Sequence, residues 1–176
     1  EYREGLPAPA PAGDPDGCTL QVILPVLNGG KAVERCLKSV ESSRASNDRK
    51  FEVIVVDDAS TDRDLCRFLD REFAAGRVRL VRHSENRGFV RSVQTGLRQH
   101  RQCDVVLLNS DTQVFGNWLD RLAACADADP SIASVTPFSN NATLCSYPVI
   151  DRANSMEPET ARALDAQCAA LNAGQC

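Results

Sequence analysis

Short apolar runs alternate with amphipathic stretches along most of the chain. The apolar runs have the length and the Val and Ile content of buried strands, and they lie at 19–26, 51–56, 78–83, 104–108 and 131–137. The stretches between them place apolar residues at helical spacing, as in Val33, Cys36, Leu37 and Val40, in Leu65, Phe68, Leu69 and Phe73, and in Val90, Val93 and Leu97. Strands that alternate with helices of this length indicate βαβ units. The sequence therefore predicts an α/β fold with a mostly parallel sheet sandwiched by helices.

The two ends of the chain differ from this alternating region. Residues 1–17 are rich in Pro and Ala and are typical of a flexible arm. Residues 18–150 form the predicted α/β domain. The tail, 151–176, predicts one helix that begins near Pro158, with Ala161, Leu164, Cys168 and Leu171 along one face. The chain begins with Glu1 rather than Met, so we expect a piece of a longer protein.

Composition narrows the classes of function. The net charge of −4 over 176 residues provides no basic surface for nucleic acid. No apolar run is long enough for a membrane span, and no signal segment opens the chain. The eight cysteines are widely spaced, without a CxxC pair, and several lie within apolar patterns. We therefore expect buried free thiols and a reducing, cytoplasmic compartment.

Polar residues gather just after four of the predicted strands. In an open parallel sheet, ligands bind beyond the carboxyl ends of the strands, where the strand order reverses. The residues at these positions are Pro25, Val26, Leu27 and Asn28, then Asp57, Asp58, Ala59 and Ser60, then Ser84, Glu85, Asn86, Arg87 and Gly88, and finally Asn109, Ser110, Asp111 and Thr112. Three aspartates at one edge of a sheet predict a binding site there.

Each of these positions also has a purely structural interpretation. Asp58 or Ser60 fits the N-cap of a helix that starts near Thr61, although a cap explains one acid and not two in succession. Asn86 and Gly88 fit a turn followed by a helix cap. Asp111 fits an ordinary loop residue, and Arg87 and Arg91 fit either solvent exposure or phosphate contact. The residues alone leave these alternatives open.

A carboxylate directly after a buried strand also suits a hard divalent cation. Mg²⁺ or Mn²⁺ is typically held by one or two carboxylates together with substrate phosphates. Such an ion would stabilise negative charge on a departing diphosphate. We take Asp111 as the candidate ligand for this ion.

Four motifs together carry a resemblance to a known family. VILPVLNGG, FEVIVVDDASTD, ENRGFVRSVQTGL and DVVLLNSDTQVFGNWLDRL resemble, in order and spacing, the nucleotide-binding half of family 2 glycosyltransferases with the GT-A fold. The resemblance extends from about Thr19 to Pro137. SNNATLCSYP is similar to the continuation in bacterial members that use nucleotide-diphosphate sugars. The resemblance implies a GT-A, Rossmann-like sheet, a hexosyl or deoxyhexosyl donor of the UDP or dTDP type, and a glycan or lipid-linked acceptor in polysaccharide biosynthesis.

The resemblance also implies roles for individual residues. Asp58 would accept a hydrogen bond from the base, Asp57 would support the loop or approach the ribose, and Asp111 would take the metal position of the family's DxD-like motif. That motif is Asn109-Ser110-Asp111 here, with one acid instead of two. The other residues expected to line the nucleotide are Pro25, Val26, Asn28, Asn86, Gly88, Arg91, Asn109 and Ser110.

The family's general base is not assigned to any residue of this chain. Family members place it, usually as an Asp, in the acceptor-binding half downstream of these motifs, where it drives an inverting in-line attack. We expect it beyond Cys176, so that this chain would be truncated before the acceptor-binding half. The acids Asp151, Glu157, Glu159 and Asp165 fit the solvated face and first turn of the tail helix.

Other protein classes fit less well. A receiver domain carries its acid pair after the first strand and needs a late lysine, whereas the lysines here are Lys31, Lys38 and Lys50. A dinucleotide-binding oxidoreductase needs Gly-x-Gly-x-x-Gly after the first strand, and a nucleotidyltransferase needs a basic Gly-rich loop. The remaining alternative is a non-catalytic nucleotide-sugar-binding module of a larger protein.

Overall fold

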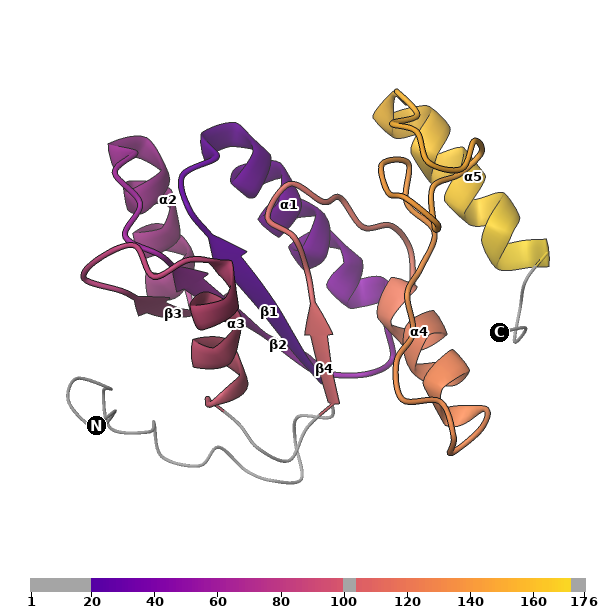
Figure 1. Cartoon of the computed structure of the whole chain (residues 1–176), viewed down its shortest axis with the longest axis horizontal. Helices are drawn as coiled ribbons and strands as arrows, with labels where there is room; N and C mark the ends of the chain where they lie inside the picture. The colour runs from indigo at the N-terminus through magenta and orange to yellow at the C-terminus, as the bar shows by residue number, and fades with distance from the viewer. Residues whose placement is uncertain (1–19, 100–103, 172–176) are drawn as a thin grey trace. The chain divides into compact units, whose positions relative to one another are not determined.

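The computed structural model describes residues 20–99 and 104–171 (Figure 1). The predicted arm at 1–17 and the cysteines Cys18, Cys103 and Cys176 lie outside the described residues. The chain divides into two compact units, Glu1–Ser42 with Arg49–Gln113, and Ser43–Asp48 with Val114–Cys176. The elements in chain order are β1 Leu20–Val26, α1 Gly30–Ser43, a 3₁₀ turn η1 Arg44–Ser46, β2 Phe51–Asp57, α2 Arg63–Ala74, β3 Arg79–Arg82, α3 Phe89–Leu97, β4 Asp104–Leu107, α4 Trp118–Asp127 and α5 Pro158–Leu171.

The first unit is built on a parallel four-stranded sheet with the order β3-β2-β1-β4. The chain runs outward from β1 through β2 to β3 and then returns through α3 to β4, on the other side of β1 (Figure 1). Because such crossovers are right-handed, this reversal puts α3 on the opposite face of the sheet from α1 and α2. The reversal is the topological switch point, at the carboxyl ends of β1 and β4. The predicted α/β fold with helices on both faces is confirmed.

The core of the first unit lies between β1, β2 and the helices. Val22, Leu24, Ile54 and Val55 are completely buried in the two central strands. The predicted face of α1 is correct, since Val33, Cys36, Leu37 and Val40 are all buried. Helix α2 begins at an N-cap that the sequence did not identify: the Asp62 carboxylate accepts from the backbone N–H groups of Asp64 and Leu65. The cap interpretation of Asp58 and Ser60 is therefore wrong.

Helix α3 presents a different face to the sheet from the one that its apolar residues predict. Val90 is 66% exposed and Leu97 is 42% exposed, whereas Ser92, Thr95 and Gly96 are buried. A Cβ at position 96 would lie 2.4 Å from Cγ2 of Ile23 in β1. The helix therefore approaches β1 so closely that only small residues fit between them. The predicted inward stripe is wrong at Val90 and Leu97, while Val93 is half-buried, because close backbone approach rather than apolar area selects this face.

Replacing Gly96 with Ala should lower the free energy of unfolding by about 1–3 kcal/mol, since the added methyl overlaps Ile23. Chemical denaturation of the parent and of Gly96→Ala measures the difference. An Ile23→Ala change removes the overlapping atoms, so the double variant should lose less than the sum of the two single variants. If the losses of Gly96→Ala and Ile23→Ala simply add in the double variant, the close contact between the two positions is contradicted.

Gln21 is a buried polar residue in the middle of β1. It is 0% exposed, and neither its side-chain oxygen nor its nitrogen has a hydrogen-bond partner among the described residues. An unsatisfied buried amide costs about 1–3 kcal/mol. Gln21→Met keeps a similar shape without the polar atoms, so it should raise the free energy of unfolding by about 1 kcal/mol or more. Gln94→Met, on the exposed side of α3, is the control. A Gln21→Met variant less stable than the parent would contradict the conclusion that the Gln21 amide is buried without a hydrogen-bond partner.

The second unit contains α4 and α5. Trp118, Leu119 and Ala123 of α4 are buried, and the Trp118 indole N–H donates to Ser43 Oγ over 3.0 Å. Asn117 occupies the N-cap position as predicted but makes no side-chain cap bond. Asn47 Oδ1 caps the helix instead, accepting from the N–H groups of Leu119 and Asp120. Helix α5 begins at Pro158 as predicted, and Arg121 donates to its Asp165 over 2.6 Å.

Two sequence predictions in the second unit are wrong. The predicted strand at 131–137 is not formed, because within the described ranges these largely exposed residues find no neighbouring strand with which to pair. Cys125, expected as a free thiol, is disulfide-bonded. Cys36, Cys66, Cys145 and Cys168 are free, as expected, but only Cys36 is buried and the other three are half-buried.

Candidate functional site

The adjacent acids that end β2 are each paired with one of two adjacent basic residues that end β3. Asp57 lies opposite Arg82 in the strand register, and its Oδ2 accepts from Arg82 Nε over 2.9 Å. Asp58 Oδ1 lies 2.6 Å from Nδ1 of His83. Sequence reasoning read Arg82 and His83 as ordinary strand residues. Parallel neighbouring strands that end in Asp-Asp and Arg-His were the signal for this double pairing.

Asp57 is a buried structural acid. Its residue is 1% exposed, and its Oδ1 accepts from Ser60 N over 3.0 Å. Arg82 also donates to the Asp70 carboxylate and to Cys66 O, so it ties the end of β2 to α2. Partial burial works to lower the pKa of Arg82, but its bonds to the two carboxylates prevail and raise it. This arrangement suits a loop support, the first of the two roles expected for Asp57.

Asp58 connects β2 to the loop that precedes α3. In addition to His83, its carboxylate accepts from Arg87 N over 2.9 Å and from Gly88 N over 2.7 Å. Burial alone would raise the pKa of Asp58, but these hydrogen bonds and the nearby His83 together lower it. Asn86 Oδ1 also accepts from Gly88 N, and Gly88, with φ of 80°, is the N-cap residue of α3. The turn-and-cap interpretation of Asn86 and Gly88 is confirmed.

The lowered pKa of Asp58 predicts acid sensitivity. Because its folded-state pKa lies below the unfolded value of about 3.9, its stabilising effect is complete above that pH and is lost as the pH falls through the folded-state pKa. The free energy of unfolding of the parent should fall below about pH 4, and Asp58→Asn should show a shallower slope there. Glu85→Gln, at an exposed carboxylate of the same loop, is the control. If the free energy of unfolding falls equally steeply with pH in the parent and in Asp58→Asn, the Asp58 carboxylate is not the source of the acid sensitivity.

Asn28 fastens the end of β1 to the start of α2. With φ of 56°, it donates its N–H to Ser60 Oγ over 2.8 Å, and its Oδ1 accepts from the N–H groups of Thr61 and Asp62. Asp58 N donates to Val26 O over 2.8 Å and extends the pairing of β1 with β2. Pro25 and Val26 therefore lie beside the acid pair, and the exposed Leu27 follows them.

The loop after β4 lies on the other side of β1. Leu108 N donates to Ile23 O over 3.0 Å, and Thr112 N closes a turn on Asn109 O. The Cys36 thiol of α1 lies 3.6 Å from Asn109 O and so links this loop to α1. Burial, and secondarily the charge of Asp111, raises the pKa of Cys36 to about 12, so this thiol is not a nucleophile near neutral pH.

Asp111 is the exposed acid of this loop. In the part of the chain that the structure describes, its carboxylate makes no ion pair or hydrogen bond. Neighbouring strands lie about 4.8 Å apart, so β2 and β4 are separated by about 10 Å across β1. The loops that carry Asp58 and Asp111 therefore follow strands on opposite sides of β1. Arg91 lies in the first turns of α3, which begins at the Gly88 loop.

Among the described residues, the carboxyl edge of the sheet offers too few side-chain ligands to hold a metal ion without ligands from a substrate or water. No cluster of three or more His, Cys, Asp or Glu side chains with metal-binding geometry occurs in residues 20–99 and 104–171. A single free carboxylate fits an ion that takes its remaining ligands from a diphosphate and water. Asp111 is such a group, whereas Asp57 and Asp58 are already held by their own partners.

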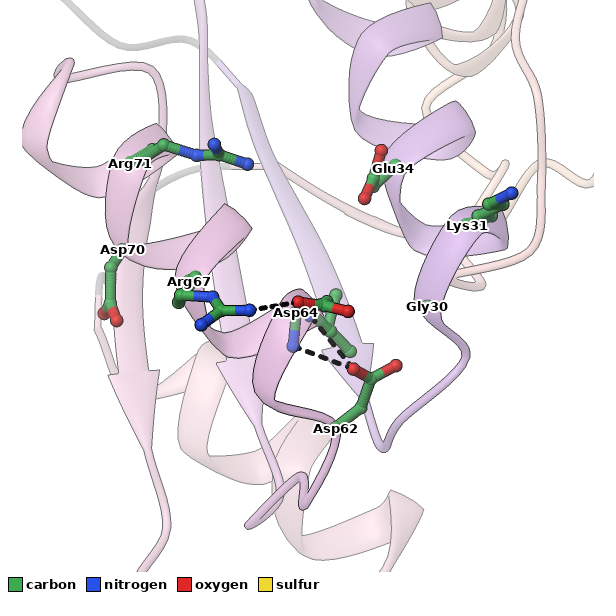
Figure 2. Close-up of a pocket in the computed structure, with 9 residues that line it drawn as sticks. Gly30, Lys31, Glu34, Asp62, Asp64, Arg67, Asp70 and Arg71 are labelled. Carbon is green, nitrogen blue, oxygen red and sulfur yellow. Dashed lines mark hydrogen bonds and ion pairs between the residues drawn. The ribbon is translucent and has the colours of Figure 1, made fainter.

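A separate open hollow lies between the first turns of α1 and α2 (Figure 2). Its volume is about 790 Å³. The charged side chains that line it are of both signs, Lys31, Arg67 and Arg71 against Glu34, Asp62, Asp64 and Asp70. Figure 2 shows Arg67 turned toward Asp64, with which it pairs, and Asp62 capping its own helix. This near balance gives the hollow little preference for a diphosphate.

The structure describes no helix with both the length and the apolar character to cross a bilayer.

Comparison with known proteins shows the family of this chain. Residues 21–168 match the family described as glycosyl transferase family 2. Glycosyltransferase AglE of Haloferax volcanii is 28% identical over 104 residues, which are 58% of this chain and 33% of AglE. The crystal structure of S. aureus TarS 1-349 in complex with UDP is 27% identical with a TM-score of 0.51, over 62% of this chain and 32% of that one.

A second TarS structure, in complex with UDP-GlcNAc, is similar to the same degree, with 27% identity, a TM-score of 0.51 and coverage of 62% of this chain and 31% of that one. This chain therefore spans about a third of the length of these relatives. The family match covers most of the described residues and includes both loops that flank the end of β1. The chain belongs to glycosyl transferase family 2.

Proposed function

We propose that this chain binds the nucleotide-diphosphate sugar of a glycosyltransferase that transfers a hexosyl or deoxyhexosyl group to an acceptor hydroxyl with inversion. The observation that carries the proposal is the strand order, in which β2 and β4, the strands whose following loops carry Asp58 and Asp111, lie on opposite sides of β1. In this proposal the nucleotide lies across β1, with its base toward β2 and its diphosphate toward β4.

The donor site consists of three loops in this proposal. Asp58 accepts from the base, while Pro25 and Val26 form the floor. Asn86 and Gly88 shape the loop that holds Asp58. Arg91, near the start of α3, is the residue proposed to line the nucleotide from this helix. The structures of TarS in complex with UDP and with UDP-GlcNAc support a UDP-type donor. dTDP is the second nucleotide to test. Asp57 and Asn28 support these loops from within.

A divalent cation, Mg²⁺ or Mn²⁺, is part of the proposed site. The free Asp111 carboxylate fits a hard cation. The Asn109 carbonyl, which contacts Thr112 N and the Cys36 thiol, holds the loop that carries Asp111, and Ser110 lies in the same loop. When bound, the cation neutralises charge on the leaving diphosphate. The other residues of the proposed site would orient the base and the ribose, so that the diphosphate reaches the cation at Asp111.

The acceptor is proposed to be a glycan or a lipid-linked sugar in polysaccharide biosynthesis. Inversion requires a general base that removes the proton of the acceptor hydroxyl as the hydroxyl attacks the anomeric carbon. Three acids with ionic partners are unsuited to this role. Asp57 and Asp58 are held by Arg82 and His83, and Asp165 is paired with Arg121.

Calorimetric titration with UDP, dTDP and GDP, each with and without Mn²⁺, tests the proposal. We expect one of the uridine or thymidine diphosphates to bind, and to bind more tightly with Mn²⁺. GDP serves as the comparison for base preference. Failure of all three nucleotides to bind would contradict donor binding by this chain.

A further inference from the structure

His83 is the buried partner of the acid that faces the base in the proposed donor site. Its side chain is 6% exposed and that of Asp58 is 4% exposed, and their atoms Nδ1 and Oδ1 lie 2.6 Å apart. His83 follows β3, and its backbone N–H donates to Asp57 O over 2.9 Å. His83 is therefore held both by its backbone N–H and by the hydrogen bond between its imidazole ring and Asp58.

The bonds to the Asp58 carboxylate leave few of its acceptor positions unused. A carboxylate offers about four lone-pair positions, two on each oxygen. Oδ1 accepts from His83 Nδ1 and from Arg87 N, whereas Oδ2 accepts only from Gly88 N. Within the described residues, the remaining acceptor position is on Oδ2. The bonds to Asp58 thus leave its remaining acceptor position on a single oxygen.

The other ring nitrogen of His83 is anchored on α3. Nε2 lies 3.0 Å from Thr95 Oγ1, and Thr95 Oγ1 lies 2.9 Å from Arg91 O. Thr95 and Gly96 form the small inward face of α3, where Gly96 permits the close approach to β1. The small inward face of α3 therefore places the Thr95 hydroxyl beside Nε2 of His83. Both ring nitrogens then have a partner, Asp58 at Nδ1 and Thr95 at Nε2.

This arrangement points to His83 as a positioning residue that controls base selectivity. We propose that His83 holds Asp58 with one Oδ2 acceptor position toward the nucleotide, and so favours bases with a ring N–H over bases without one. The inference rests on the proposed donor site. Uracil presents an N3–H to the carboxylate, whereas cytosine presents a bare N3 that a carboxylate repels. A site built to accept a hydrogen bond discriminates strongly against such an analogue.

The experiment compares UDP with CDP, which share ribose and diphosphate and differ only in the base. Calorimetry in the presence of Mn²⁺ gives the ratio of the two dissociation constants. The parent should bind UDP about tenfold or more tightly than CDP. His83→Phe should reduce this ratio to about 1–2 through weaker UDP binding, with CDP affinity little changed. His83→Asn, whose amide N–H replaces Nδ1–H, should restore most of the ratio.

Two further variants separate positioning from simple folding effects. Thr95→Val removes the anchor at Nε2 but keeps the Asp58 contact, so the ratio should fall by only about two- to threefold. Asp111→Asn should weaken UDP and CDP by the same factor, because both carry the diphosphate. Retention of the parental ratio in His83→Phe, or equal loss for UDP and CDP, would overturn the inference. If the parent binds neither nucleotide, the proposed function fails, and this inference fails with it.

Discussion

Replacing Asp111 with Asn is expected to remove the Mn²⁺-dependent gain in UDP affinity, a loss on the order of 10- to 100-fold, since even changes in groups that orient metal ligands have this size. Asp111 is exposed at the carboxyl end of β4, and its carboxylate has no ion pair or hydrogen bond within the described ranges. Asn preserves the shape but removes the charge that a hard cation requires. Titration of UDP with and without Mn²⁺ measures the effect.

Asp104→Asn is the matched control for this change. Asp104 is an exposed acid at the amino end of the same strand, so its replacement alters the net charge equally at the opposite edge of the sheet. Without Mn²⁺, the parent and Asp111→Asn should bind UDP with similar affinity. If Asp111→Asn keeps the full response to Mn²⁺, or if Asp104→Asn loses it, Asp111 is not the metal ligand.

Replacing Arg82 with Met is expected to lower the free energy of unfolding by about 3 kcal/mol. The change leaves the Asp57 carboxylate, whose side chain is 2% exposed, without its charged partner. It also removes the bonds from Arg82 to Asp70 and Cys66 O that tie β3 to α2. Denaturation by urea measures the loss. Adding Asp57→Asn should recover part of it, because the uncompensated buried charge is then absent.

Arg79→Met provides the comparison on the same strand. Arg79 pairs with Glu52 over 3.1 Å between two partly exposed side chains, and such a pair contributes less than about 1 kcal/mol. The contrast between the two variants isolates the effect of burial. An Arg82→Met variant no less stable than Arg79→Met would show that Asp57 does not depend on Arg82.

The sequence was sufficient to predict where the polar groups collect. Alternation of short Val- and Ile-rich runs with amphipathic stretches predicted the parallel sheet, and reading the residue after each strand led to Asp58 and Asp111. It was not sufficient to predict what those groups contact. Strand order decides which ends are neighbours, and only the order β3-β2-β1-β4 brings Arg82 and His83 beside Asp57 and Asp58.

Helix α3 and residues 131–137 show why periodicity has limits. An apolar stripe predicts burial only where the neighbouring surface leaves room, and at α3 the closeness of Ile23 admits Gly96 and Thr95 instead of Val90 and Leu97. A strand exists only through pairing, which a local pattern of Ile132 and Val135 does not specify. Asp62 was likewise overlooked as a cap, because the sequence offers several acids before α2 and only the backbone geometry selects one.

In the proposed donor complex, Asp58 and Asp111 hold opposite ends of one nucleotide across the end of β1. A crystal structure of the chain with UDP and Mn²⁺ would show whether they do. We expect Mn²⁺ bound to the Asp111 carboxylate at about 2.0–2.2 Å, with the diphosphate beside it and the uracil N3–H on Asp58 Oδ2. A nucleotide seated in the hollow between α1 and α2, or a metal ion bound away from Asp111, would contradict it.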